Sequence, residues 1–175
     1  LLFTECASIW PESTQGWALG ISDDRFIPGL TRLVDAVHAV GGKIGIQIYE
    51  AAEGCMNGHA DISKLRIMSP IDKFRGKWKA IPAEELPLVA EAFGKAAHRA
   101  HLCGFDAIEI HCGHNYLLHQ FLSPHFNTRT DEYGGSLENC MKFPLMCIEE
   151  TRKNWPEDKP LFMRIVSKDD YTYDA

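Results

Sequence analysis

The order of apolar segments constrains the fold of this chain more than any other feature. Four short apolar runs have the length and composition of strands, at 1–5, 43–49, 105–111 and 159–166. Segments of helical periodicity lie between them, at 26–42, 83–104 and 136–153. Strands that alternate with helices form a parallel sheet, because each helix returns the chain to the edge where the previous strand began. The sequence therefore predicts an α/β fold.

Two α/β folds fit this alternation, a doubly wound sheet and part of a (β/α)8 barrel. No G-x-G-x-x-G motif follows a predicted strand, so the dinucleotide-binding fingerprint of the doubly wound fold is missing. Polar or reactive residues stand at the end of each predicted strand: Glu5 with Cys6, Gln47, His111 and Arg164. In a barrel these ends open onto one face, where the active site lies. We therefore favour the barrel.

The length of the chain bounds how much of a barrel it can form. A complete TIM barrel needs eight strands and typically about 250 residues. Residues 1–175 supply about four βα units, so we expect a single partial barrel domain that belongs to a longer protein. Without opposing strands, we expect the inner faces of two strands to expose four isoleucines, Ile44, Ile46, Ile108 and Ile110.

Composition excludes several classes of partner. The formal net charge of −6 argues against nucleic acid, whose phosphates require a basic surface. No apolar run approaches the roughly 20 residues that span a bilayer, and the N-terminus lacks the basic region of a signal peptide. The six cysteines include no C-x-x-C pair, which favours reduced thiols in a cytoplasmic protein. The sequence is compatible with a homo-oligomer.

The segment EIHCGHNYLLHQF, residues 109–121, concentrates three histidines, a cysteine and a tyrosine. A metal site is one interpretation, with His111, His114, His119 and Glu109 as ligands. Against it, His119 follows on a helical turn that points elsewhere. A structural interpretation makes the other histidines surface or helix-face residues: His98, His101, His119 and His125.

A third interpretation makes the segment a set of hydrogen-bond donors at the barrel mouth. His111 ends a strand, and His114 and Tyr116 follow within one turn. Two N–H donors can polarise a carbonyl or nitro oxygen, and a tyrosine hydroxyl can give a proton to carbon. Gln47 and Arg164, an amide and a fixed cation, suit the edge of a flat heteroaromatic ring. None of these groups transfers hydride unaided, so a flavin is the expected missing part.

The sequence GFDAIEIHCGHNYLLHQFLSPHFNTRTDEYGGSLEN, 104–139, closely resembles the signature of the Old Yellow Enzyme family of FMN-dependent (β/α)8 oxidoreductases. The resemblance extends over nearly the whole chain. TECASIWPES is similar to the segment after the second strand of the family, GGKIGIQI to its third strand and KPLFMRIVSKDDY to its fifth. The chain would then cover roughly strands two to five, without the strands six to eight that carry the phosphate-binding loops.

The resemblance implies specific roles. His111 and His114 match the pair that holds the substrate oxygen above the flavin, and Tyr116 matches the proton donor. The implied FMN contacts are Cys6, Gln47, His111 and Arg164. The implied function is reduction, by NAD(P)H through FMN, of activated C=C bonds in α,β-unsaturated carbonyl or nitro compounds. A non-catalytic barrel remnant and a metal-dependent barrel hydrolase are the alternatives.

Several positions depart from the family pattern. The run after Gln47 reads IYEAAEG, so Tyr49, Glu50 and Ala51 replace a His-Ala-Gly-Arg type sequence. Cys140 stands where an arginine is common, and Pro144 should kink the helix predicted over 136–153. A loop within the signature is expected to be mainly architectural: Asn127, Arg129, Asp131, Tyr133, Gly134 and Gly135.

Overall fold

The computed structural model describes residues 1–10, 18–51, 68–71 and 79–169. The main sheet contains β1 (Leu2–Ser8), β2 (Leu19–Gly20), β3 (Ile44–Tyr49), β6 (Ala107–Cys112) and β7 (Leu161–Ile165). A second, two-stranded sheet pairs β4 (Met68–Ser69) with β5 (Lys79–Ala80). The helices are η2 (Asp24–Phe26), α1 (Ile27–His38), η5 (Ala83–Glu85), α2 (Leu86–Leu102), α3 (Leu117–Leu122) and α4 (Leu137–Lys153).

The strand order of the main sheet, β2-β1-β3-β6-β7, is that of a barrel wall. All of its neighbouring strands are parallel, and the four long strands follow one another in sequence order without the reversal of a doubly wound sheet. The sheet is also strongly curved, since the rings of Phe3 on β1 and Phe162 on β7 meet with their centroids 5.8 Å apart. The prediction of a partial TIM barrel is confirmed.

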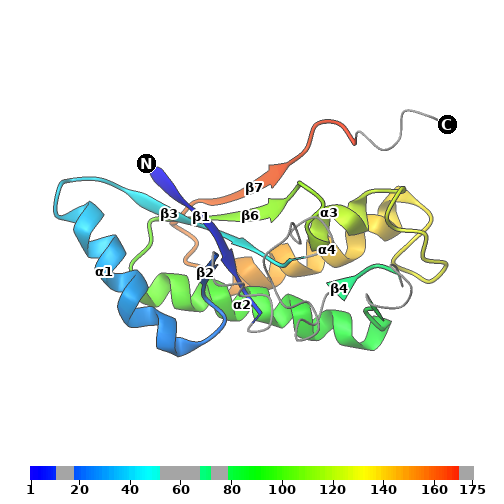
Figure 1. Cartoon of the computed structure of the whole chain (residues 1–175), viewed down its shortest axis with the longest axis horizontal. Helices are drawn as coiled ribbons and strands as arrows, with labels where there is room; N and C mark the ends of the chain where they lie inside the picture. Colours follow the sequence, from blue (N-terminus) through cyan, green and yellow to red (C-terminus); the bar gives the residue numbers. More distant parts are fainter. Residues whose placement is uncertain (11–17, 52–67, 72–78, 170–175) are drawn as a thin grey trace.

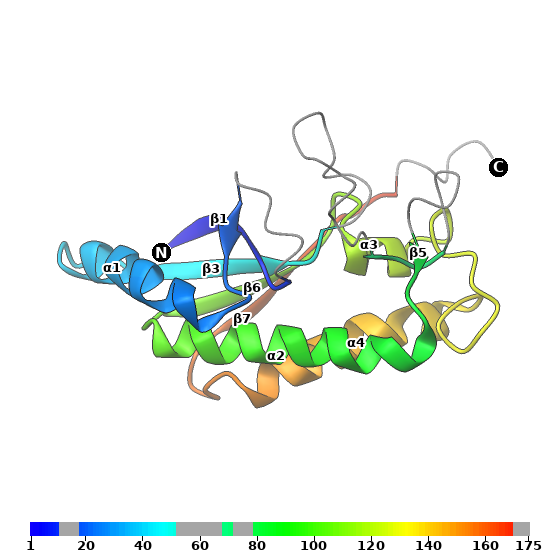
Figure 2. The same cartoon turned by 60° about the horizontal axis from the view of Figure 1, so that its bottom comes forward.

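The long helices lie along one face of this sheet. Figures 1 and 2 show α2 and α4 running side by side beneath the strands. α1 contributes Leu30 and Val34 to the same core, and α2 contributes Phe93. The long helices cover this face, so the opposite face of the strands is the inner face of the barrel.

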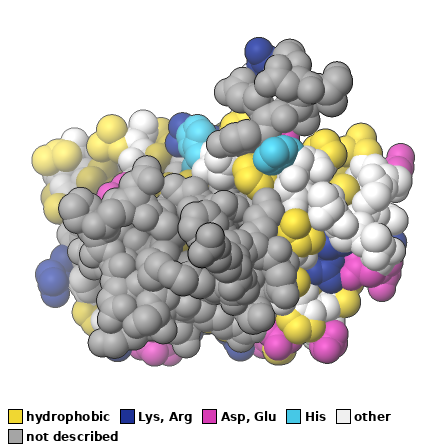
Figure 3. Space-filling view, turned by 45° about the vertical axis from the view of Figure 1, so that its right-hand side comes forward, with side chains coloured by type: hydrophobic (Ala, Val, Ile, Leu, Met, Phe, Trp, Pro, Cys, Tyr) yellow, Lys and Arg dark blue, Asp and Glu magenta, His cyan; other side chains and the backbone are white. Residues whose placement is uncertain are grey.

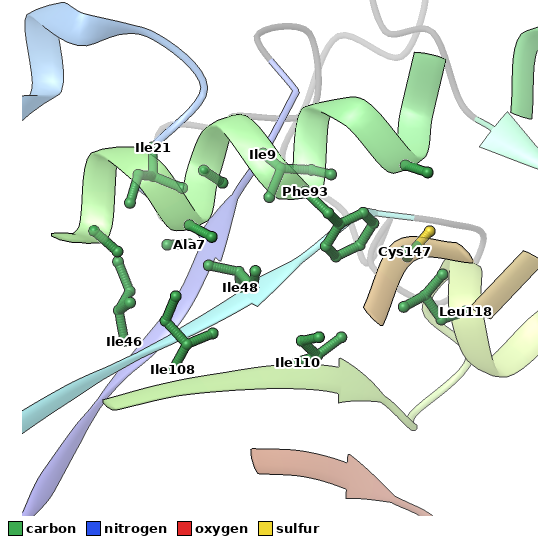
Figure 4. Close-up of a cluster of buried hydrophobic side chains, with 14 of the residues drawn as sticks. Ala7, Ile9, Ile21, Ile46, Ile48, Phe93, Ile108, Ile110, Leu118 and Cys147 are labelled. Carbon is green, nitrogen blue, oxygen red and sulfur yellow. The ribbon is translucent and has the colours of Figure 1, made fainter. Parts of the chain in front are cut away.

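The four isoleucines expected on the inner face lie instead in the helix-covered core. Ile44 is 4% exposed, and Ile46, Ile108 and Ile110 are 0% exposed. Figure 4 shows Ile46, Ile108 and Ile110 pointing into the cluster that contains Phe93. The expectation was wrong because side chains alternate along a strand, and residues of this parity face the helices.

The inner face therefore carries the residues of opposite parity. Gly45, Gln47 and Tyr49 of β3 alternate with the isoleucines. A Cβ at Gly45 would collide with the ring of Phe3, so the absent side chain makes room for that ring. The register pairs Cys6 with Gln47, Gln47 with Glu109, and His111 of β6 with Arg164 of β7. Two neighbouring rows across the sheet, Cys6–Gln47–Glu109 and His111–Arg164, thus collect most of the predicted site residues.

Local sequence signals account for the helix ends. The Ser136 side chain accepts a hydrogen bond from the Asn139 N–H and caps α4. Pro87 lies in the first turn of α2, where its missing N–H costs no helical hydrogen bond. The chain leaves α1 through Gly41, at φ +75°, a conformation that glycine adopts without strain. Pro144 lies inside α4, and the kink it should cause stays a prediction.

Some predicted boundaries differ from the structure. β1 continues to Ser8 because Ala7 and Ser8 pair with both β2 and β3, so Cys6 lies within the strand. The polar segment after β1 contains β2 and η2, which carry too few apolar residues to be recognised. Much of the irregular stretch predicted over 50–80 lies outside the described residues, as do 11–17 and the end of the IYEAAEG run.

Candidate active site

His111 forms the base of a polar cluster where β6 ends. Its side chain is buried, with the residue 1% exposed, and burial lowers its pKa to about 4, with further lowering by His114 and Arg164. The Gly113 N–H donates to His111 Nδ1 at 3.1 Å. A neutral ring that accepts at Nδ1 carries its proton on Nε2, so this bond assigns the tautomer. His111 therefore presents a neutral N–H donor to the barrel mouth.

His114 and Tyr116 contact the ring of His111. His114 Nδ1 lies 3.2 Å from His111 Nε2. In the tautomer just assigned, the Nε2–H of His111 donates a hydrogen bond to His114 Nδ1. The Tyr116 ring meets the His111 ring edge to face, with centroids 4.6 Å apart. Histidine side chains are visible on the side of the molecule toward which β6 and β7 point (Figure 3). The predicted donor set is thus a contiguous cluster.

Gln47 connects the neighbouring strands to this cluster. The Cys6 thiol donates to Gln47 Oε1 at 2.8 Å, and Gln47 Nε2 donates to the carboxylate of Glu109. Burial raises the pKa of the Cys6 thiol, while a hydrogen bond with Tyr116 and the charge of Arg164 lower it. Cys6 therefore touches both Gln47 and Tyr116, and Arg164 is close enough to influence Cys6 and His111. The structure brings all six predicted site residues together.

Tyr49 is a site neighbour that the sequence interpretation did not include. It is fully buried, and its ring contacts the Tyr116 ring edge to face at 4.7 Å between centroids. Tyr116 is therefore held between Tyr49 on one side and His111 on the other. The signal was present in the sequence, since Tyr49 follows Gln47 at the spacing that keeps both side chains on the inner face.

His119 is buried, which corrects its interpretation as a surface or helix-face histidine. The residue is 5% exposed, and its Nδ1 accepts the backbone N–H of Asn115 at 3.0 Å. The turn before α3 places the ring beneath the site, which helical spacing alone did not reveal. Among the described residues, no group of three or more His, Cys, Asp or Glu side chains is arranged to hold a metal ion.

The loop that the sequence predicts to be architectural ties together several segments. Asn127 Nδ2 donates to the carbonyls of Phe121 and Tyr133, each at 2.8 Å. Arg129 donates to the carbonyls of Pro70 and Ile81 and forms an ion pair with Asp131. These bonds are internal to the scaffold and leave the cluster around His111 untouched.

The turn between β6 and α3 contains two non-glycine residues in the left-handed region, His114 at φ +53° and Asn115 at φ +63°. Asparagine tolerates this conformation better than most residues, whereas a β-branched side chain is strongly disfavoured. We expect Asn115→Val to lower the free energy of unfolding by about 1–3 kcal/mol, and Asn115→Gly to be close to neutral. Urea unfolding of the holoprotein measures both; an equal loss in the two variants would contradict the φ-based argument.

The fold and the cluster together define a partial barrel with a candidate ligand site at the carboxyl ends of its strands. Comparison with known proteins identifies the family. The profile of the NADH:flavin oxidoreductase / NADH oxidase family matches residues 1–175. The chain therefore belongs to this family, whose cofactor is FMN and whose reductant is NAD(P)H.

Individual relatives agree with this assignment. The chain is 40% identical to an NADPH dehydrogenase of Bacillus subtilis over 98% of its own length and 50% of the relative. It is also 40% identical to an NADH:acrylate oxidoreductase of Vibrio harveyi, over 78% of its length and 14% of that protein. An Old Yellow Enzyme homologue from Zymomonas mobilis superposes with a TM-score of 0.83 at 25% identity, over 94% of this chain and 49% of the other. The chain thus spans about half the length of the NADPH dehydrogenase.

Proposed function

We propose that the protein containing this chain reduces activated C=C bonds of α,β-unsaturated carbonyl or nitro compounds, with FMN as cofactor and NAD(P)H as reductant. The observation that carries the proposal is the contact of Tyr116 with His111, which itself contacts His114. A neutral donor pair beside a tyrosine hydroxyl supplies the two things that alkene reduction needs from a protein: polarisation of an oxygen and a proton for carbon.

The roles of the three side chains follow from their chemistry. A substrate oxygen near His111 would accept the hydrogen bond that the His111 Nε2–H now donates to His114. His114 would then turn its own N–H donor toward the same oxygen. Withdrawal of electrons through that oxygen makes the β-carbon electrophilic. Tyr116, half-buried between two rings, is placed to deliver its proton to the neighbouring carbon. Bound FMN, once reduced, would supply the hydride.

The donors around the cluster fit a flavin ring. Gln47 offers an amide, Cys6 a backbone and a thiol, and Arg164 a permanent positive charge beside His111. An N–C=O edge that gains negative charge on reduction is stabilised by such a cation and by N–H donors. These four residues are the proposed FMN contacts, and residues 1–175 the proposed partial FMN-binding domain.

The names of related proteins support this substrate class. One relative is an NADH:acrylate oxidoreductase, and acrylate is an α,β-unsaturated acid. Morphinone reductase, a structural neighbour with a TM-score of 0.80 at 26% identity, points the same way. The proposed partner is therefore a small molecule.

No helix in the described part of the chain is long and apolar enough to cross a membrane. Cytoplasmic location and homo-oligomerisation stay predictions of the sequence.

An anaerobic assay of the FMN-loaded protein tests the proposal. We expect NADPH or NADH oxidation to be stimulated by 2-cyclohexenone and by a nitroalkene, with formation of the saturated product. Bound flavin without any such turnover would favour the alternative, a non-catalytic barrel remnant. A purified holoprotein without flavin absorbance at about 450 nm would contradict both the proposed function and the non-catalytic flavin-barrel alternative.

The double variant His111→Ala/His114→Ala should lose tight binding of phenols and enones. Each lost hydrogen bond to the polarised oxygen costs about 1–3 kcal/mol, so affinity should fall by roughly 30-fold or more in total. Titration of the flavin spectrum of the FMN-loaded protein with a phenol measures this. His98→Ala, an exposed position on α2, is the matched control. Unchanged affinity in the double variant would exclude the donor-pair assignment.

A further inference from the structure

The backbone N–H and the backbone carbonyl of Asn115 are both hydrogen-bonded to side chains of α3. The N–H of Asn115 donates to His119 Nδ1 at 3.0 Å, and its carbonyl accepts from Gln120 Nε2 at 3.0 Å. Both side chains are buried, with His119 5% and Gln120 0% exposed. Two consecutive residues of one short helix thus fix the single residue that separates His114 from Tyr116.

These two hydrogen bonds, of Asn115 with His119 and Gln120, form a clamp on the turn. The clamp acts on a backbone conformation that an isolated chain would rarely adopt. His114 and Asn115 are both at positive φ, which costs about 1–3 kcal/mol for a residue other than glycine unless its surroundings impose it. The chain closes the turn with a hydrogen bond from the Tyr116 N–H to the Gly113 carbonyl at 3.1 Å. Loss of the clamp would let the turn relax and would move His114 and Tyr116 relative to His111.

We propose that His119 is a positioning residue, which holds the left-handed turn at Asn115 and thereby sets His114 and Tyr116 against His111. The proposal rests on the function proposed above, because it assigns to His119 a role in building that site. His119 is not among the proposed contacts of substrate or flavin. Its contribution is the acceptor at Nδ1, and Gln120 completes the clamp from the other side.

The acceptor role requires a neutral imidazole with Nδ1 unprotonated. Burial lowers the pKa of His119, and His114 lowers it further, whereas the carboxylate of Asp169 raises it. Asp169 is itself bonded to the hydroxyl of Ser123 at the end of α3. An amide side chain can replace the ring in this role, because the oxygen of asparagine occupies the position of histidine Nδ1.

Three variants of the FMN-loaded protein separate positioning from general stabilisation. His119→Leu fills the space of the ring but removes the acceptor, and His119→Asn restores an acceptor at the same position. His98→Leu makes the same chemical change at an exposed site of α2. Phenol affinity, melting temperature and amide hydrogen exchange of a peptide spanning 113–118 are measured for each.

We expect phenol affinity to fall about tenfold in His119→Leu, the loss equivalent to about 1.4 kcal/mol, and to return to within about threefold of wild type in His119→Asn. Exchange at the 113–118 peptide should quicken in His119→Leu alone. Equal affinity and exchange in wild type and His119→Leu would overturn the proposal. So would equal impairment of the Leu and Asn variants accompanied by an equal drop in melting temperature, which would mean that His119 only fills space.

The exchange measurement also distinguishes failure of this inference from failure of the proposed function. If the wild-type protein binds no phenol, the proposed function is wrong, and exchange at 113–118 still reports whether His119 holds the turn. If the wild type binds phenol and the exchange of His119→Leu matches it, the function stands and the positioning role is wrong.

Discussion

Replacement of Tyr116 by phenylalanine should slow alkene reduction by about 10²–10⁴-fold while flavin reduction by NAD(P)H stays nearly intact. A general acid acts only in the half-reaction in which a proton is transferred to carbon. The ring of Tyr116 packs between His111 and Tyr49, and phenylalanine preserves both contacts. The variant therefore removes the proton, together with the hydrogen bond to Cys6, and keeps both ring contacts.

Stopped-flow measurement of the two half-reactions checks this expectation. Flavin reduction is followed after mixing with NADPH or NADH, and reoxidation after mixing the reduced protein with 2-cyclohexenone. Tyr133→Phe, which removes a tyrosine hydroxyl in the loop at 127–135 away from the cluster, is the control. Equal slowing of both half-reactions would show that Tyr116 positions the nicotinamide or the flavin rather than donating a proton.

The architecture could be predicted because each long element carries its own periodicity. The strand composition of 43–49 and the apolar face of Leu86, Val89 and Phe93 on α2 are local properties of the chain. All of β3 and these three residues of α2 are buried in the structure. The faces of β3 and β6 that turn toward the helices were not predicted correctly. Alternation along a strand tells which residues share a face, but not which of the two faces meets the helices. The isoleucines of β3 and β6 could therefore be assigned only together with Gln47, which lies on the opposite face.

The residues of the candidate site could be predicted from the sequence, but the side chain that supports the turn between them could not. His111, His114 and Tyr116 are close in sequence, and Gln47 and Arg164 follow from the parallel register of their strands. His119 escaped prediction because its role depends on the two positive φ values before α3, which bring the Asn115 N–H onto the ring. Such a backbone-to-side-chain bond has no periodic signature, since it arises only after the turn has formed.

A polypeptide consisting of residues 1–175 alone should neither retain FMN nor stay monomeric. Part of the exposed apolar surface lies at the edge strand β7, where Phe162 is 43%, Met163 48% and Ile165 59% exposed. Within the described residues β7 pairs only with β6, so its outer edge offers unpaired backbone groups to another chain. Met163 and Ile165 pair with Ile110 and Cys112 and share their face of the sheet, so the helix-covered side is itself incomplete at this edge.

The energies make this exposure decisive for the isolated segment. Burying one such side chain is worth about 1.5–3 kcal/mol, while a domain has only about 5–15 kcal/mol of net stability. Three exposed side chains on one edge strand therefore represent a large part of that total, and association of edges recovers it. Phosphate sites of TIM barrels are formed by the loops after strands seven and eight, so the four long strands present here hold a flavin ring at most by its edge.

Gel filtration with in-line absorbance tests this expectation on the isolated segment. We expect colourless material that elutes as aggregates or oligomers, whereas a chain that includes the remaining barrel strands elutes yellow and monodisperse. Substitution of Phe162 and Ile165 by lysine should reduce association of the isolated segment without restoring flavin, since charges protect an edge but supply no phosphate loops. A monodisperse, yellow species of 19.7 kDa that reduces 2-cyclohexenone would refute the half-barrel argument.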